Sequence, residues 1–230
     1  MFNPEAIFHR LLYLPLFILA LSVHEWAHAW MAHRLGDDTA RLQGRLTLNP
    51  LAHIDPIGTI VMPVFIGFIG WAKPVPFTPV ALSRKVSMRT GIMLVALAGP
   101  VSNLIQAFVG AILFGLVAGI AFRASHGGDI GWFDIFQDFA VRFISLNCML
   151  AVFNLIPINP LDGSKVLYGI LPRKLGDALI DNEFLTKWGF LILMVIFVAA
   201  SPVAEVLLWP AEALTHLLFR FGSLIAGLIA

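Results

Sequence analysis

The chain has 230 residues, of which 59% are hydrophobic and only 13% are charged, with a formal net charge of +1. Soluble domains have about 45–50% apolar and about 25% charged residues, so the composition excludes an ordinary soluble domain. The near-neutral charge argues against a nucleic-acid partner. The single cysteine, Cys148, excludes a disulfide within the chain. The sequence therefore predicts an all-α polytopic membrane protein surrounded by the lipid bilayer.

Long apolar stretches indicate the helices that we expect in the membrane, since a spanning helix needs about 20 apolar residues. In chain order they cover 6–34, 91–122, 138–159, 185–200 and 204–229. This pattern predicts about five spanning helices in a single domain, 1–230. Within the second stretch, "GP" at 99–100 is expected to break or kink the helix, because proline lacks an N–H group.

Between the first two long stretches lies a shorter apolar element near 57–70. Its sequence, "PIGTIVMPVFIGFIG", is interrupted by proline and glycine and has basic residues on both sides. We expect it to be re-entrant, which requires a protein-lined or water-filled cavity, because exposed backbone is not tolerated in lipid. The flanking segments 41–50 and 71–80 have extended, proline-restricted patterns, and short strands on the cytoplasmic rim are expected there.

The distribution of lysine and arginine predicts the orientation of the chain. The segments 34–56, 72–90 and 160–187 are basic, whereas the connection 123–137 carries aspartates. Basic loops remain on the cytoplasmic side. We therefore expect a multi-pass protein of the cell membrane, with the first three segments inside and 123–137 outside.

Two histidines and a glutamate lie near the end of the first apolar stretch, in "HEWAH". On a helix, His24 and His28 lie one turn apart on one face with Glu25 beside them, the H-E-x-x-H arrangement of a metal site with a general base. The alternative is a polar cluster that forms hydrogen bonds between helices. Because ionisable groups inside a spanning helix are costly and mark functional sites, the sequence favours a metal site. His33 lies nearly opposite His24 and is not expected to be a ligand.

A catalytic zinc ion takes three protein ligands and a water, so a third ligand must come from elsewhere in the chain. One candidate is Asp162 in "FNLIPINPLDG", at the cytoplasmic end of an apolar helix, although Pro-Leu-Asp-Gly is also ordinary turn chemistry. His53 and Asp55 in "NPLAHIDPIGT" are rival candidates, and the alternative for both is that they shape the entry to a loop. Spacing alone leaves all three open.

Amide side chains within the apolar stretches form a second group of polar residues. Asn147 and Asn154 share one helix face, while Asn103 and Gln106 lie in the other long apolar stretch. Most such groups link helices, with a contribution of about 0.6 kcal/mol on average. Asn154 is the better functional candidate, because it closely precedes Asp162 and an amide there can donate to the oxyanion of a tetrahedral intermediate.

Taken together, these motifs resemble the site-2 protease family of intramembrane zinc metalloproteases. The resemblance rests on "HEWAH", "GWAKPVPF", "ALAGPVSN" and "NLIPINPLDG". These motifs are spread from about 20 to 165, so we expect a catalytic core at about 6–165, followed by C-terminal helices at 185–229. The connection 123–137 is too short for a PDZ domain and the chain ends in an apolar run, so we expect a compact member without PDZ or C-terminal regulatory domains.

The resemblance implies roles for individual residues. One Zn²⁺ per chain would be held by His24, His28 and Asp162, with Glu25 as the general base and Asn154 near the oxyanion or the substrate. The expected reaction is hydrolysis of a peptide bond in or near a transmembrane segment, with the active site toward the cytoplasm. The expected partner is a transmembrane protein substrate, such as a membrane-anchored regulator or a signal-peptide remnant. A catalytically silent helix-binding homologue and a metal transporter are the alternatives.

Overall fold

Helices form most of the chain in this computed structural model, which describes residues 4–65, 67, 70–82, 86–125, 131–180, 182–199 and 201–230. The long helices are α1 (Pro4–Arg34), α4 (Met88–Ser125), α5 (Gly131–Asn154), α8 (Glu183–Ala199) and α9 (Ser201–Ile229). The short elements are α2 (Thr39–Leu42), η1 (Pro50–Ala52), η2 (Pro56–Val61), α3 (Met62–Phe65), η3 (Pro79–Ala81), α6 (Asp162–Ile170) and α7 (Arg173–Ile180).

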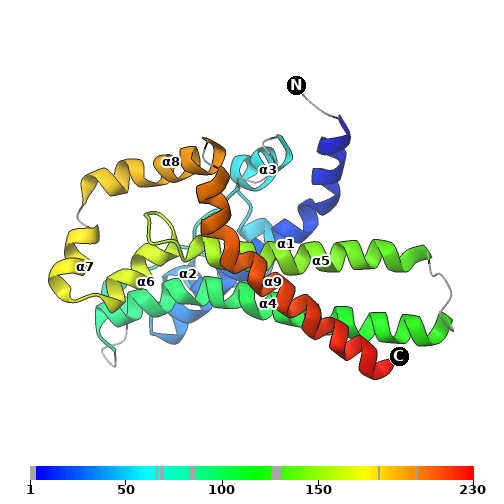
Figure 1. The fold of residues 1–230 in the computed structure, drawn as a ribbon. Coiled ribbons are helices and arrows are strands. Elements are labelled where there is room, and N and C mark those ends of the chain that lie inside the picture. Colours follow the sequence, from blue (N-terminus) through cyan, green and yellow to red (C-terminus); the bar gives the residue numbers. More distant parts are fainter. Residues whose placement is uncertain are drawn as a thin grey trace.

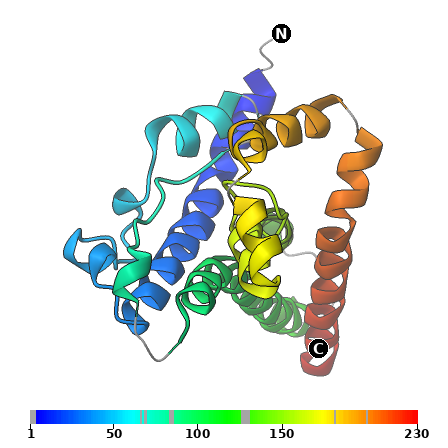
Figure 2. The same cartoon turned by 90° about the vertical axis from the view of Figure 1, so that its left-hand side faces the viewer.

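The longest helix, α4, is the centre of the fold, and α1, α5, α6 and α9 all pack against it (Figures 1 and 2). Glycines permit the closest of these contacts. A Cβ atom at Gly115 would lie 2.4 Å from the carbonyl oxygen of Gly222, so α4 and α9 meet backbone to backbone. Small residues at such crossings are typical of helices that associate in membranes. The core between α4, α5 and α9 consists of Ala107, Ala111, Ile144, Cys148 and Ala211.

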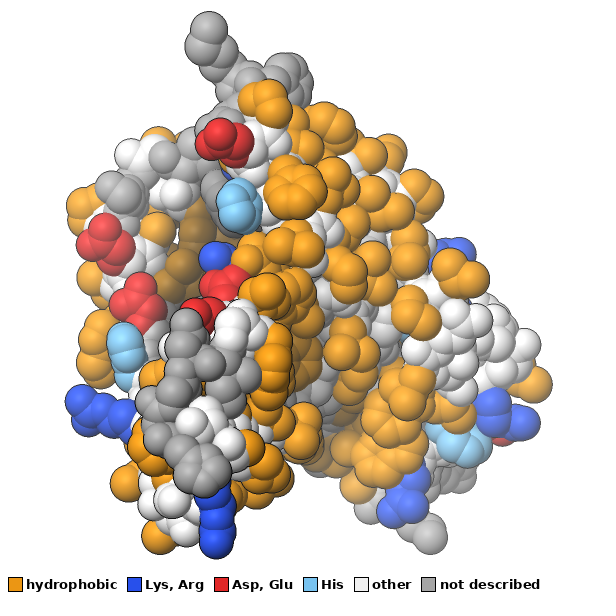
Figure 3. All heavy atoms as spheres, turned by 90° about the vertical axis from the view of Figure 1, so that its right-hand side faces the viewer, with side chains coloured by type: hydrophobic (Ala, Val, Ile, Leu, Met, Phe, Trp, Pro, Cys, Tyr) orange, Lys and Arg blue, Asp and Glu red, His pale blue; other side chains and the backbone are white. Residues whose placement is uncertain are grey.

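Within the described residues, four helices are long and apolar enough to cross a membrane: Pro4–Arg34, Met88–Ser125, Gly131–Asn154 and Pro202–Ile229. The all-α membrane fold is therefore confirmed, with four such helices rather than about five. The fifth candidate, α8, has 17 residues, at the lower limit of a span of about 17–25. Figure 3 shows one face of the molecule covered largely by hydrophobic side chains, with most charged side chains toward its edges.

Two helix boundaries differ from the predicted ones. Helix α4 continues through Pro100, so of the predicted break or kink the break is wrong; Gly99 and Pro100 are buried in the packed centre of the fold, which stabilises the helix there. Helix α5 covers 131–154 instead of 138–159. It ends earlier because Pro157 and Pro160 follow, and residues before a proline disfavour helical backbone.

The segments next to the expected re-entrant element also differ from the prediction. Residues 56–65 form η2 and α3, and 66, 68 and 69 lie outside the described residues, as do 83–85. None of the described residues is in a strand, so the expected short strands are wrong. Segment 71–78 is irregular, because Pro74 and Pro76 have no N–H group to donate to a neighbouring strand.

Candidate metal centre

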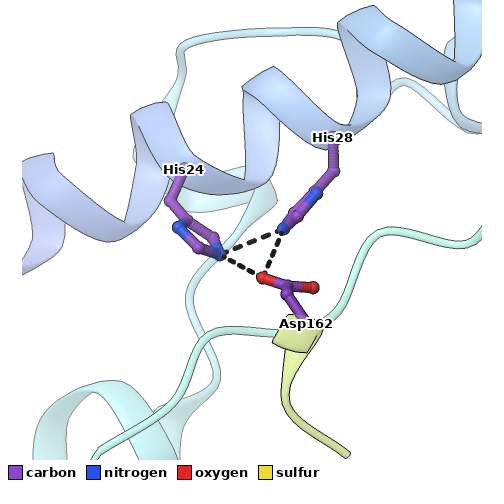
Figure 4. Close-up of side chains that lie close together, drawn as sticks. All are labelled: His24, His28 and Asp162. Atoms are coloured by element: carbon purple, nitrogen blue, oxygen red, sulfur yellow. Dashed lines mark hydrogen bonds and ion pairs between the residues drawn. The ribbon is translucent and has the colours of Figure 1, made fainter. Parts of the chain in front are cut away.

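Three side chains from two helices converge at one point inside the molecule. His24 and His28 come from α1, and Asp162 is the first residue of α6 (Figure 4). The Oδ2 atom of Asp162 lies 3.3 Å from Nε2 of His24 and 3.2 Å from Nε2 of His28. The two Nε2 atoms are 3.0 Å apart. Among the described residues, this is the one group of three or more metal-binding side chains that lie close together.

Glycine explains how the Asp162 carboxylate reaches this point. A Cβ atom at the next residue, Gly163, would lie 2.2 Å from the carbonyl oxygen of Leu155 and 2.5 Å from that of Ile156. The end of α5 and the start of α6 are therefore pressed together. The turn between them is closed by a hydrogen bond of 2.7 Å from Ser164 Oγ to the Leu161 carbonyl. Because α6 also packs on α4, Asp162 is held close to α1.

The same principle applies where α4 passes the two histidines. A Cβ atom at Gly99 would lie 2.4 Å from Nε2 of His28 and 2.6 Å from Cε1 of His24. Only a residue without a side chain allows the imidazole rings to lie against the α4 backbone at this position. The Gly-Pro pair in "ALAGPVSN" therefore positions the site rather than ending the helix.

The outer nitrogens of both imidazoles face hydrogen-bond acceptors. Nδ1 of His28 donates to the Val95 carbonyl oxygen at 2.7 Å, and Nδ1 of His24 lies 2.6 Å from Oδ1 of Asn103. A neutral imidazole carries one proton, so with Nδ1 protonated each Nε2 presents a lone pair. Two lone pairs and a carboxylate oxygen then point at one another, an arrangement that a cation between them stabilises.

The spacing of these three atoms suits zinc. A tetrahedral zinc ion with bonds of about 2.0–2.1 Å to nitrogen and oxygen separates its ligand atoms by about 3.3–3.4 Å. The observed separations of 3.0, 3.2 and 3.3 Å are close to that value. The chemistry of the donor set, two imidazoles and one carboxylate, is also that of catalytic zinc sites with an open fourth position. The residues present therefore fit a zinc ion.

Glu25 lies next to the cluster and is partly buried. Its Oε2 atom accepts a hydrogen bond of 2.9 Å from the backbone N–H of Val75. This contact links α1 to the irregular segment 71–78 and orients the carboxylate beside the two histidines. A cavity of about 380 Å³ opens here, and its walls include all three cluster residues together with Glu25, Asn154 and Lys165.

The two rival third ligands have other roles. His53 is buried, with Nε2 2.8 Å from the Thr47 carbonyl and Nδ1 3.5 Å from the Arg45 guanidinium. Asp55 caps η2, because its Oδ1 accepts from the N–H groups of Ile57 and Gly58 at 3.0 and 2.7 Å. Neither residue belongs to the cluster.

Arg45 holds this neighbouring region together. It is buried and donates a hydrogen bond of 2.5 Å to the carbonyl of Lys73. Burial lowers the pKa of the Arg45 guanidinium, whereas the negative charge of Glu25 raises it. The guanidinium therefore lies within electrostatic range of the site and anchors the segment that contacts Glu25.

Asn154 lines the cavity but its amide is engaged elsewhere. Its Nδ2 atom donates to the carbonyl of Leu150 at 3.0 Å, one turn earlier in α5. A role toward substrate therefore requires this hydrogen bond to be exchanged for one to the substrate.

Some contacts at the site were missed by sequence reasoning. Asn103, read as a link between helices, is in direct contact with His24, and its place four residues after Gly99 in "GPVSN" is the one available signal. Lys165 lies one helical turn after Asp162, so its position in the cavity wall follows from α6 being a helix. The carbonyl of Val95 and the N–H of Val75 are backbone groups, which the sequence does not distinguish.

Curated relatives agree with this geometry. The chain is 37% identical over 210 residues to YwhC of Bacillus subtilis (strain 168), whose name describes a zinc metalloprotease, and the match covers 87% of this chain and 90% of YwhC. The chain belongs to the site-2 protease family. It is a membrane-embedded zinc metalloprotease, and Zn²⁺ is its cofactor.

More distant relatives have names of the same kind. The chain is 32% identical over 187 residues to Rip2 of Mycolicibacterium smegmatis and 29% identical over 194 residues to Rip2 of Mycobacterium tuberculosis. Each match covers 80% of this chain and 65% of Rip2. No family model and no solved structure matches the chain.

Proposed function

We propose that this protease hydrolyses a peptide bond in or near a transmembrane segment of a membrane-protein substrate, at a zinc ion held by His24, His28 and Asp162. The observation that carries the proposal is the convergence of three electron-pair donors beside Glu25, in a cavity among apolar helices. A bound zinc ion would supply a water with a pKa near 7 and polarise the scissile carbonyl.

Glu25 is the general base in this proposal. The Val75 N–H holds Oε2, which orients the carboxylate so that it can take the proton from the water and later deliver it to the leaving amine. Asn154, in the cavity wall, would donate its amide to the oxyanion of the tetrahedral intermediate, where such donors stabilise developing charge. Its present acceptor is a backbone carbonyl of its own helix, so the amide needs only a side-chain rotation.

The irregular segment 71–78 has the features of a substrate-binding edge. Alternate residues direct their N–H groups inward, to the Gly58 carbonyl, the His53 carbonyl and the Glu25 carboxylate; the donors are Trp71, Lys73 and Val75. The carbonyls of Trp71 and Lys73 are likewise taken up, by Thr59 and Arg45. One edge of this segment is thus bonded to the protein.

The opposite edge offers mainly acceptors. In an extended segment neighbouring residues face opposite sides, so Ala72, Pro74 and Pro76 present their carbonyls away from the bonded edge, and the two prolines have no N–H group. Ala72 and Pro74 line the cavity. A substrate strand that donates its own N–H groups would pair here by strand addition. The substrate helix must unwind first, because a helix uses its N–H groups internally.

A second cavity suits an apolar substrate segment. It has a volume of about 270 Å³, lies between α5, α8 and α9, and shares Gly70, Leu150, Phe153 and Phe190 with the cavity of the metal centre. The remaining residues of its wall are also apolar or small: Phe17, Met149, Met194, Phe197, Ala204 and Leu208. The substrate class that fits is a single-span membrane protein, such as a membrane-anchored regulator or a signal-peptide remnant.

We further propose that the active site faces the cytoplasm. Asp162 follows the C-terminal end of α5, and the helix α1 ends six residues after His28 at Arg34. The segments that follow these two positions, 34–56 and 160–187, are rich in lysine and arginine. Such segments remain on the cytoplasmic side of a membrane protein.

The decisive experiment uses Glu25→Gln. A panel of tagged single-span proteins is co-expressed with the protease, and cleavage is followed by separation of the two tags on a gel. Wild type is expected to cut at least one member, and Glu25→Gln to cut none while binding one zinc per chain. Zinc loss in Glu25→Gln, or cleavage by it, would contradict the base assignment. Zinc binding by wild type without cleavage of any member would favour a silent helix-binding protein.

A further inference from the structure

Two buried asparagines connect His24 to the backbone of a third helix. Asn103 on α4 and Asn147 on α5 are each 0% exposed. Oδ1 of Asn103 lies 2.6 Å from Nδ1 of His24, and Nδ2 of Asn103 donates to Oδ1 of Asn147 at 2.9 Å. Nδ2 of Asn147 in turn donates to the carbonyl oxygen of Phe143 at 3.0 Å. The three side chains thus form one chain of hydrogen bonds that crosses α1, α4 and α5.

The direction of every hydrogen bond in this chain follows from its far end. A backbone carbonyl only accepts, so Asn147 must direct its NH₂ group to Phe143 and its oxygen to Asn103. That oxygen also only accepts, so Asn103 must direct its NH₂ group to Asn147 and its oxygen to His24. Nδ1 of His24 is then the donor. The other ring nitrogen, Nε2, is left with its lone pair directed at His28 and Asp162.

His28 reaches the same state by a shorter route. Its Nδ1 donates directly to the carbonyl oxygen of Val95. A backbone carbonyl oxygen therefore orients each imidazole. The Val95 carbonyl contacts His28 directly, and the Phe143 carbonyl acts on His24 through the two amides. In metal sites the partner of the outer ring nitrogen sets the tautomer and ring orientation of the ligand.

We propose that Asn103 and Asn147 are positioning residues of the metal centre, which hold His24 in the Nδ1–H tautomer so that Nε2 is free to bind zinc. The proposal rests on the ligand set of the proposed function. It gives these two amides a role beyond linking α4 to α5, because their chain of hydrogen bonds ends on a ring nitrogen of a proposed zinc ligand.

The test compares zinc affinity among variants of the full chain in detergent. Asn103→Leu removes the acceptor for His24, and it is expected to weaken zinc binding about 10–100-fold, the usual effect of losing such a partner. Asn103→Asp keeps an acceptor for Nδ1 but has no donor for Asn147, so it is expected to bind zinc more tightly than Asn103→Leu and less tightly than wild type. Zinc affinity is measured by competition with a chromophoric chelator.

Gln106→Leu is the matched control. Gln106 also lies on α4 and links it to α1, through a hydrogen bond of 3.3 Å from Nε2 to the carbonyl of Ala20, but it does not contact a histidine of the cluster. We expect this variant to keep wild-type zinc affinity. If Gln106→Leu weakens zinc as much as Asn103→Leu does, or if Asn103→Leu leaves the affinity unchanged, the positioning role is wrong.

A spectroscopic readout and a double variant address the second amide. With Co²⁺ in place of zinc, Asn103→Leu and Asn147→Leu are expected to change the visible absorption bands, and Gln106→Leu to leave them unchanged. Asn147→Leu should weaken zinc binding less than Asn103→Leu, and the double variant should equal Asn103→Leu alone, since the chain is already broken. Additive losses would contradict a shared chain. Should Asn103→Leu not fold, Asn147→Leu set against Gln106→Leu carries the same comparison: weaker zinc binding in Asn147→Leu alone supports the positioning role, and equal affinities overturn it.

His24→Ala separates this inference from the proposed function. If His24→Ala keeps full zinc affinity, the ligand set itself is wrong and the positioning role falls with it. If His24→Ala loses zinc while Asn103→Leu keeps it, the ligand set stands and only the positioning role is overturned.

Discussion

The chain contains two polar regions of similar composition, and the structure gives them opposite uses. At the metal centre, the outer ring nitrogens of the two histidines have hydrogen-bond partners. The two Nε2 atoms and a carboxylate oxygen of Asp162 are directed at a common point. Around His53 and Asp55, the polar atoms contact backbone groups and an arginine. The comparison shows that a metal ligand is identified by the electron pairs that neighbouring groups leave available on its side chain. Residue type and proximity to a motif are not sufficient.

Removing Asp162 should have the largest effect in this comparison. Asp162→Ala deletes the one carboxylate that meets both histidines, so zinc content should fall from about one per chain to near zero, and cleavage with it. Asp55→Ala removes only the cap of η2, which costs about 0.5–2 kcal/mol of stability. Zinc content by elemental analysis checks both. Zinc retained in Asp162→Ala but lost in Asp55→Ala or His53→Ala would reverse the roles of the two regions.

A methyl group at Gly99 should be the next most severe change. In Gly99→Ala the new Cβ lies 2.4 Å from Nε2 of His28, so the imidazoles must move, and zinc affinity is expected to drop at least tenfold. Gly227→Ala is the matched control, because that glycine has nothing within 4 Å of the added atom. This control should leave zinc binding unchanged, and both variants are measured by competition with a chromophoric chelator. Equal zinc affinities for the two variants would refute the steric argument.

A milder effect is expected in the second polar region. Arg45→Met removes the hydrogen bond to the Lys73 carbonyl and loosens the segment that contacts Glu25, without touching the zinc ligands. Hydrogen bonds from charged groups contribute about 1.5–3 kcal/mol, so kcat/KM should fall about tenfold, mainly through KM, at unchanged zinc content. Arg34→Met, an exposed cation at the end of α1, should change neither parameter. Zinc loss in Arg45→Met would mean that the two regions are not separate.

The smallest effect is expected at an exposed ion pair outside both regions. Hydrogen bonds from Arg41 and then from His33 hold the pKa of Asp38 at about 2. Because the pKa is lower in the folded chain, its contribution to stability is present above pH 4 and is lost as the pH falls toward 2. Asp38→Asn should lower the Tm slightly at pH 7 and not at all near pH 2. A large drop at pH 7 would show that solvent does not screen this pair.

The sequence predicts the two histidine ligands and Glu25 more securely than the third ligand. The spacing of His24, Glu25 and His28 is readable because an α-helix repeats every 3.6 residues, and the apolar stretches set the membrane fold. The residues alone leave Asp162 as one of three candidates for the third ligand, and the resemblance favours it. The choice depended on α6 packing against α4 and on Gly163 fitting between backbone carbonyls, which are long-range contacts without a local signal.

The hydrogen bonds that link His24 to Asn103 and Asn103 to Asn147 could not be predicted from the sequence. His24 and Asn103 are 79 positions apart, and Asn103 and Asn147 are 44 apart. Their contact requires the exact register of three helices, and no periodic pattern specifies it. The absence of strands among the described residues was missed for a related reason: proline marks irregular backbone without showing which acceptors the neighbouring N–H groups will find.

The buried position of Cys148 has a practical consequence. The chain has one cysteine, and it is 0% exposed in the core between α4, α5 and α9. A thiol enclosed in this way reacts poorly with water-soluble alkylating reagents. The natural sequence therefore already provides an almost silent background for site-directed labelling, and a cysteine introduced along 71–78 or on α8 would report directly, by its rate of modification, on the path that a substrate follows to the zinc.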